Sequence, residues 1–172
     1  MLNCFAMDIT TLGNQSFRLK GKTAAVIADI LKFGVEVDKK VKMEIGEPGE
    51  YEIGGISIIG FKFGENIIFV FEMDGFRIAY LGNFSGEISD EKVSQLGSID
   101  LLIINVGINT KESVKMTSLI DPYFIFPFSE GQSIETFLSE SGLTVEKMDK
   151  FSLKKEDILE DQSAKIILLP NK

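Results

Sequence analysis

The stretch PGEYEIGGISIIGFKF, residues 48–63, predicts a β-hairpin, because two runs with alternating polar and apolar side chains flank the turn Gly54-Gly55. Asp74-Gly75 predicts a second hairpin between strands at residues 67–72 and 76–81, since this dipeptide favours a two-residue turn. Further runs with strand character precede residue 48, at residues 5–11, 16–20, 23–28, 35–37 and 41–45. The first half of the chain therefore predicts antiparallel sheet.

The second half alternates between helix and strand signals. Ser89 and Asn109 are predicted helix N-caps, and Gly142 is predicted to end a third helix. The expected helices cover residues 89–96, 109–119 and 133–141, and the expected strands cover residues 99–105, 123–126 and 164–169. Hairpins followed by this alternation predict one α/β domain over residues 1–172, with two packed sheets and helices outside them.

Charge and apolar patterning exclude several partners. The net charge is −8, and lysine and arginine form no basic stripe, so nucleic acid and anionic membranes are not expected partners. No apolar run approaches the roughly 20 residues of a membrane-spanning helix. The N-terminus has no signal-peptide pattern and Cys4 stands alone, so we expect a cytoplasmic protein.

The chain contains no histidine. Histidine is the side chain that titrates near neutral pH and the commonest transition-metal ligand. Its absence removes serine–histidine and cysteine–histidine nucleophile pairs, imidazole acid–base chemistry and histidine-based zinc sites together.

Six segments carry a family signature. Residues 48–56 read P-G-E-Y-E-I-G-G-I, and residues 96–107 read L-G-S-I-D-L-L-I-I-N-V-G. With residues 9–17, 23–29, 66–83 and 125–129, in this order and spacing, they resemble the lactonase-like branch of the metallo-β-lactamase superfamily, the relatives of ascorbate-6-phosphate lactonase. The resemblance implies a four-layer αββα β-sandwich flanked by helices.

The resemblance also implies zinc, and the ligands for zinc are missing. Relatives bind the metal through an H-x-H-x-D-H loop, later histidines and an aspartate, but the segment between Asp29 and Pro48 is too short for that loop. Relatives carry a histidine near the start of the domain, the aspartate of an L-G-D motif and a final histidine. At these three positions this chain has Asn14, Asn83 and Ser129, respectively. We therefore expect a truncated metallo-β-lactamase-like fold with a degenerate site, without metal, cofactor or catalytic residues.

Each surviving polar residue also has a structural interpretation. Asn14, Asp29 and Asn83 stand in turn contexts, and Ser129 followed by Gln132 is typical of a helix cap. If the fold holds, the vestigial-site residues meet at one edge of the sandwich and could bind a small polar ligand or a hard cation. These residues are Asn14, Asp29, Asn83 and Ser129.

The leading hypothesis is a non-catalytic, metal-free protein that acts through binding or assembly. One alternative is a weak hydrolase that uses an oxygen-ligated divalent metal; another is a subunit whose partner chain supplies the missing histidines. Loss of a covering helix would expose apolar surface, which predicts a homo-oligomer through the truncated face. The aromatic residues considered for that surface are Phe61, Phe63, Phe69 and Phe71.

Overall fold

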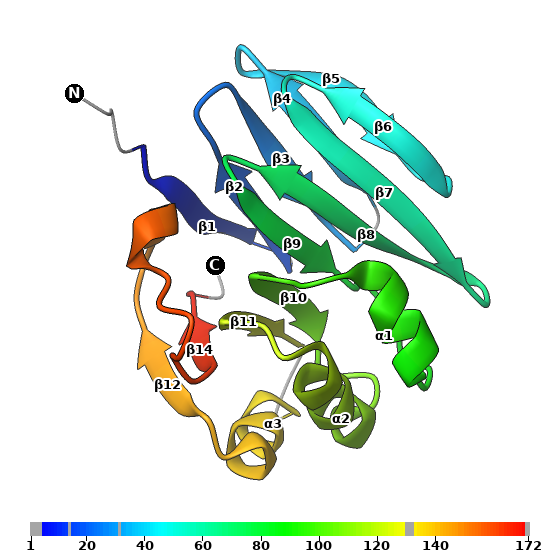
Figure 1. Ribbon diagram of the computed structural model, residues 1–172, viewed down its shortest axis with the longest axis vertical. Helices are drawn as coiled ribbons and strands as arrows, with labels where there is room; N and C mark the ends of the chain where they lie inside the picture. The colour runs from blue at the N-terminus through cyan, green and yellow to red at the C-terminus, as the bar shows by residue number, and fades with distance from the viewer. Residues whose placement is uncertain (1–4, 14, 31, 130–132, 171–172) are drawn as a thin grey trace.

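The computed structural model describes residues 5–13, 15–30, 32–129 and 133–170, which form two face-to-face β-sheets with helices on one side (Figure 1). The first sheet has six strands in the order β13-β1-β2-β3-β4-β5, and every neighbouring pair is antiparallel. Its strands are β1 (Met7–Gly13), β2 (Ser16–Lys20), β3 (Ala24–Ala28), β4 (Phe33–Val37), β5 (Lys40–Ile45) and β13 (Phe151–Leu153).

The second sheet has eight strands in the order β12-β14-β11-β10-β9-β8-β7-β6. Its strands are β6 (Gly49–Ile53), β7 (Ile56–Phe63), β8 (Asn66–Met73), β9 (Phe76–Tyr80), β10 (Leu101–Asn105), β11 (Phe124–Phe128), β12 (Thr144–Lys147) and β14 (Lys165–Leu168). The strands from β6 to β9 pair as antiparallel hairpins, and β10, β11, β14 and β12 extend the sheet in parallel from β9. All five residues of β10 are buried, as a parallel strand covered on both faces requires.

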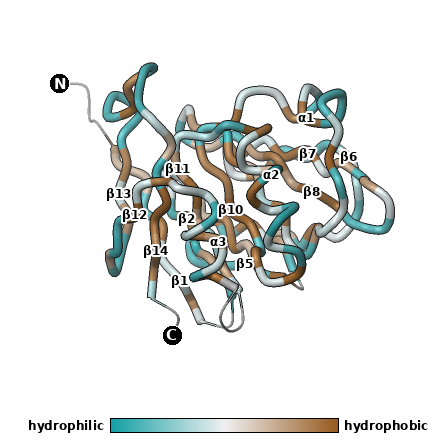
Figure 2. The backbone as a smooth tube through the Cα atoms, turned by 90° about the horizontal axis from the view of Figure 1, so that it is seen from below, coloured by the Kyte–Doolittle hydropathy of each residue, from teal (hydrophilic) through white to brown (hydrophobic). Residues whose placement is uncertain are grey.

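Among the described residues, three α-helices cover the outer face of the eight-stranded sheet. They are α1 (Asp90–Leu96), α2 (Thr110–Ile120) and α3 (Ser133–Ser141), and a short 3₁₀ turn follows at Lys155–Asp157. Leu96, Met116 and Phe137 pack from these helices onto the sheet, while a second core lies between the two sheets. Hydrophobic residues follow β8 and β10, among other strands of the interior (Figure 2). None of the described helices is long and apolar enough to cross a membrane.

The mixed α/β class and both predicted hairpins are confirmed, and three of the four expected layers are formed by described residues. No described helix covers the outer face of the six-stranded sheet, which carries polar side chains such as Thr10, Arg18 and Glu36. Arg18 and Glu36 form an ion pair there, at 3.1 Å. Water can solvate such a face, which is why the sheet is stable without a helix over it.

Two local predictions fail, for different reasons. The strand expected to stop before Pro127 continues to Phe128. The Phe128 carbonyl accepts a hydrogen bond from the Val106 N–H, so the backbone of Phe128 faces β10 and that of Pro127 faces β14. Pairing with β14 ends at Ile125, so the missing N–H of Pro127 removes no hydrogen bond from the sheet. Strands β12 and β13 were not expected, because four and three residues are too few to display an alternating pattern.

Candidate functional site

The polar residues at the end of β9, β10 and β11 meet at one edge of the eight-stranded sheet. Asn83 follows β9, Asn105 is the last residue of β10, and Ser129 follows β11. These strands are parallel, so their carboxyl ends lie side by side. The fold thereby brings together residues that are more than twenty positions apart in sequence.

An amide relay links two of these residues. The Gly107 N–H donates to Asn105 Oδ1 at 2.9 Å, and Asn105 Nδ2 donates to Asn83 Oδ1 at 3.2 Å. A backbone N–H can only donate, so this first bond fixes which end of the Asn105 amide is oxygen, and through it the orientation of Asn83. Asn105 is 8% exposed and its bonds are satisfied within the protein, whereas Asn83 is exposed to solvent.

Ser129 lies directly beside this relay. A β-carbon added to Gly107 would overlap Ser129 Oγ and would stand 3.3 Å from Asn105 Oδ1. The backbone at residue 107 therefore lies so close to Ser129 Oγ that a residue with a β-carbon would require one of the two to move. Ser129 is buried. Its predicted partner in a helix cap, Gln132, lies outside the described residues, so the cap interpretation stays a prediction.

Asp29 belongs to a second group on the facing sheet. Ser16 Oγ donates to its Oδ2, and its backbone exchanges hydrogen bonds with Lys32, which closes the turn after β3. Burial, and then the charge of Asp29, raises the pKa of Tyr80 above its usual value of 10.0, so this phenol stays protonated at neutral pH. The Tyr80 hydroxyl is buried, and no described residue is its hydrogen-bond partner.

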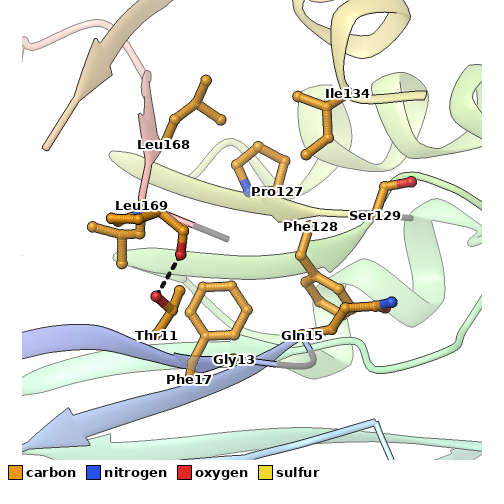
Figure 3. Close-up of a pocket in the computed structure, with 11 residues that line it drawn as sticks. Thr11, Gly13, Gln15, Phe17, Pro127, Phe128, Ser129, Ile134, Leu168 and Leu169 are labelled. Atoms are coloured by element: carbon orange, nitrogen blue, oxygen red, sulfur yellow. Dashed lines mark hydrogen bonds between the residues drawn. The ribbon is translucent and has the colours of Figure 1, made fainter. Parts of the chain in front are cut away.

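Gln15 lines two cavities at this edge. One has a volume of about 340 Å³ and is lined by Gln15, Ile30, Asn83, Asn105, Gly107 and Ile108. The other is small, about 40 Å³, and mostly apolar; Figure 3 shows Gln15 and Ser129 beside the rings of Phe17 and Phe128. Thr11 closes this second cavity by donating to the Pro170 carbonyl at 2.6 Å. Asn14, between Gly13 and Gln15, lies outside the described residues.

The side chains at this edge do not fit zinc. Zinc sites in proteins are built from thiolate, imidazole and carboxylate ligands. Among the described residues the groups at this edge are side-chain amides, hydroxyls and the carboxylate of Asp29, which already accepts a hydrogen bond from Ser16. Within the described parts of the chain, no three histidine, cysteine, aspartate or glutamate residues are grouped to hold a metal. What this arrangement can do is donate and accept hydrogen bonds without carrying a net charge at the relay.

Sequence reasoning missed Tyr80, Asn105, Gly107 and Gln15 as parts of this edge. Asn105 carried one signal, since it is a polar residue that ends the apolar run Leu101–Ile104. Tyr80 resembled an ordinary core aromatic, and nothing in the sequence showed how close Gly107 lies to Ser129. These relationships depend on the pairing of distant strands.

Comparisons with known proteins agree with this architecture. A family model described as a β-lactamase superfamily domain matches residues 44–129. A crystal structure from Thermotoga maritima, of a protein proposed to be a Zn-dependent hydrolase of the metallo-β-lactamase superfamily, is similar with a TM-score of 0.71 and 19% identity. The similarity covers 95% of this chain and 98% of that chain, so the two folds match almost end to end. No curated protein matches the chain in sequence.

Proposed function

The chain belongs to the β-lactamase superfamily domain family, and on this premise we propose that it is a metal-free, non-catalytic member that acts through binding or assembly. The observation that carries the proposal is the amide relay. Asn83 stands where the resemblance places a metal-binding aspartate, and its oxygen already accepts a hydrogen bond from Asn105. An uncharged oxygen engaged in this way is a poor ligand for zinc.

The other positions support the same proposal. Ser129 stands where relatives carry a histidine, is buried against Gly107, and has no histidine to activate it anywhere in the chain. Tyr80 stays protonated beside Asp29, so it supplies a hydrogen-bond donor and no negative charge. The described side chains at this edge are therefore arranged to donate and accept hydrogen bonds.

The test is elemental analysis of untagged protein, since a histidine tag would introduce ligands that the chain lacks. We expect less than about a tenth of an equivalent of zinc, manganese or iron, because side-chain amides, hydroxyls and one carboxylate already bonded to Ser16 give too little binding free energy to retain these ions through dialysis. Asn83→Asp, which restores the carboxylate alone, is a matched control and should remain as empty as the parent protein.

Metal that survives dialysis at near one equivalent would contradict the proposal. It would favour the alternative, a weak hydrolase with an oxygen-ligated divalent metal, and Asp29 and Asn83 would be the first residues to substitute. Co-purification with a histidine-containing relative would favour a site completed by a partner chain.

Self-association through the uncovered face of the six-stranded sheet is part of the same proposal. The phenylalanines considered for that surface lie elsewhere, since Phe69 and Phe71 are in the core between the sheets and Phe61 and Phe63 pack on the helix side. An interface on the uncovered face would therefore use charged side chains such as Arg18 and Glu36, and would weaken with salt. Light scattering at low and high salt tests this; a strict monomer at high protein concentration and low salt contradicts it.

A further inference from the structure

We propose that the cavity beside the amide relay binds a small uncharged molecule through a carbonyl oxygen, which accepts hydrogen bonds from the side-chain NH₂ of Asn83. The inference rests on the proposed function and adds to it the chemical class of the ligand. It follows from the orientation of the amides, the charges around the cavity and the nature of its walls.

The orientation of the Asn83 amide is set from inside the protein. Gly107 N–H binds Asn105 Oδ1, so the Asn105 NH₂ group must face Asn83, and Asn83 must turn its oxygen toward it. The Asn83 NH₂ group is then directed away from Asn105. No described residue accepts a hydrogen bond from it, and Asn83 lines the cavity. The Asn83 NH₂ group is therefore left for solvent or for a ligand at the cavity that Asn83 lines.

The surrounding charges disfavour an anion. None of the described residues that line the cavity is a lysine or an arginine, so its walls offer no opposite charge to an anion. The start of α2, close to Gly107, offers no compensating attraction, because Asn109 caps it and Glu112 lies in its first turn. The chain as a whole carries a net charge of −8. A neutral acceptor avoids this repulsion.

The same geometry disfavours a cation as the partner of Asn83. The group presented to the cavity is an NH₂ donor, which a cation cannot use, and Asp29 already accepts a hydrogen bond from Ser16. A neutral carbonyl oxygen is the simplest group that accepts a hydrogen bond from the Asn83 NH₂ group without bringing a charge into the cavity.

The walls suit a ligand with an apolar body. Ile30 and Ile108 flank the amides, and Ile108 is 48% exposed, so an apolar ring would cover side-chain surface that now faces water. The volume of about 340 Å³ accommodates one substituted ring. Gln15 also lines the cavity and adds a third side-chain amide to it.

Three probes of nearly identical shape separate the possibilities: benzamide, which has a neutral carbonyl; benzoate, which is an anion; and benzamidinium, a cation without an acceptor. Each is titrated into ¹⁵N-labelled full-length protein in a buffer containing a chelator, and the side-chain NH₂ resonances of Asn83 and Asn105 are followed. We expect a saturable shift of the Asn83 NH₂ signals with benzamide, at roughly millimolar concentration for a fragment of this size. Binding of benzoate and benzamidinium should be weaker by at least about tenfold, which corresponds to 1.4 kcal/mol.

The matched variant is Asn83→Asp. It keeps an oxygen for Asn105 Nδ2 but replaces the NH₂ donor with a negative oxygen, so benzamide binding, read from the Asn105 resonances, should fall at least about tenfold. Gln95→Glu makes the same amide-to-acid change on the exposed side of α1 and should bind benzamide like the parent protein. The backbone spectrum reports whether each variant is folded.

Equal binding of all three probes, tighter binding of benzoate, or no saturable benzamide shift would each overturn the inference. None of these results would affect the metal-free proposal, because the titrations contain a chelator and metal content is measured separately. Conversely, stoichiometric metal in the purified protein would overturn the proposed function whatever the probes do.

Discussion

Ser129 Oγ occupies the space that a β-carbon on Gly107 would fill, so a larger residue at position 107 requires the side chain after β11 or the backbone after β10 to move. Asn105 Oδ1 lies on the same side, 3.3 Å from that hypothetical carbon. The contact joins two loops whose parent strands are parallel neighbours. The two loops are therefore closely packed against each other at the site edge.

Gly107→Ala should therefore lower the free energy of unfolding by about 1–3 kcal/mol, as overpacking of a closed site does. The cost should be smaller in a Ser129→Ala background, because the overlap with Oγ is then gone and only the Ser129 β-carbon and Asn105 Oδ1, both at 3.3 Å, remain near the added carbon. Chemical denaturation of the four proteins of this cycle measures the difference. Gly46→Ala is the control, since nothing lies within 4 Å of a β-carbon there, and it should change stability by less than about 0.5 kcal/mol. Equal costs in both backgrounds would contradict the close contact.

Asn105→Ala should destabilise the protein more than Asn83→Ala. Removing the Asn105 side chain leaves the Gly107 N–H without its acceptor, which costs about 1–3 kcal/mol. Removing the exposed Asn83 side chain leaves Asn105 Nδ2 open to water and should cost less than about 1 kcal/mol. Urea denaturation of both variants checks the order; the reverse order would show that the relay is held from the Asn83 end.

Tyr80→Phe should leave stability at neutral pH unchanged or raise it slightly, because it removes a buried hydroxyl that has no partner among the described residues. Its larger effect should be at alkaline pH. The pKa of Tyr80 is raised in the folded state, so its contribution to stability is fully present below the unfolded value of 10.0 and is lost as pH rises above it.

Thermal unfolding followed from pH 8 to pH 11 measures this loss, which should be shallower in Tyr80→Phe. Tyr51→Phe is the control, since Tyr51 is partly exposed and its hydroxyl donates to the Glu47 carbonyl at 2.9 Å. Identical alkaline profiles for the parent protein and Tyr80→Phe would mean that Tyr80 ionises freely in the folded state.

Asp8→Asn should flatten the acid side of the stability profile. Burial acts to raise the pKa of Asp8, but hydrogen bonds from Ser152, at 2.6 Å, and Lys150, at 3.3 Å, outweigh it and hold the pKa below 3.8. The ionised carboxylate therefore stabilises the fold above pH 3.8, and this contribution is lost as pH falls through the lower folded value.

The effect should be below about 1 kcal/mol, since the carboxylate is partly exposed and screened by solvent. Acid denaturation midpoints of Asp8→Asn and of the exposed control Asp149→Asn provide the comparison. An unchanged acid limb in Asp8→Asn would show that the pairing between β1 and β13 does not depend on this charge.

The sequence predicted the hairpins around Gly54-Gly55 and Asp74-Gly75 and the helices that begin after Ser89 and Asn109, because these features depend on neighbouring residues. Ser89 and Asn109 do cap α1 and α2 through their side chains. The family resemblance, carried by short segments in a fixed order, extended this to the fold class. The sequence alone also showed that the chain has no histidine and therefore no imidazole chemistry.

Tertiary structure alone decided how the polar residues combine. Asn83, Asn105 and Ser129 are separated by long stretches of helix and strand, and only the parallel pairing of β9, β10 and β11 brings them to one edge. The pairing of β13 with β1 and the burial of the Tyr80 hydroxyl are equally invisible in a local pattern. The physical reason is that local preferences fix where a chain turns, whereas a site is made by contacts between segments that meet only after the sheets have formed.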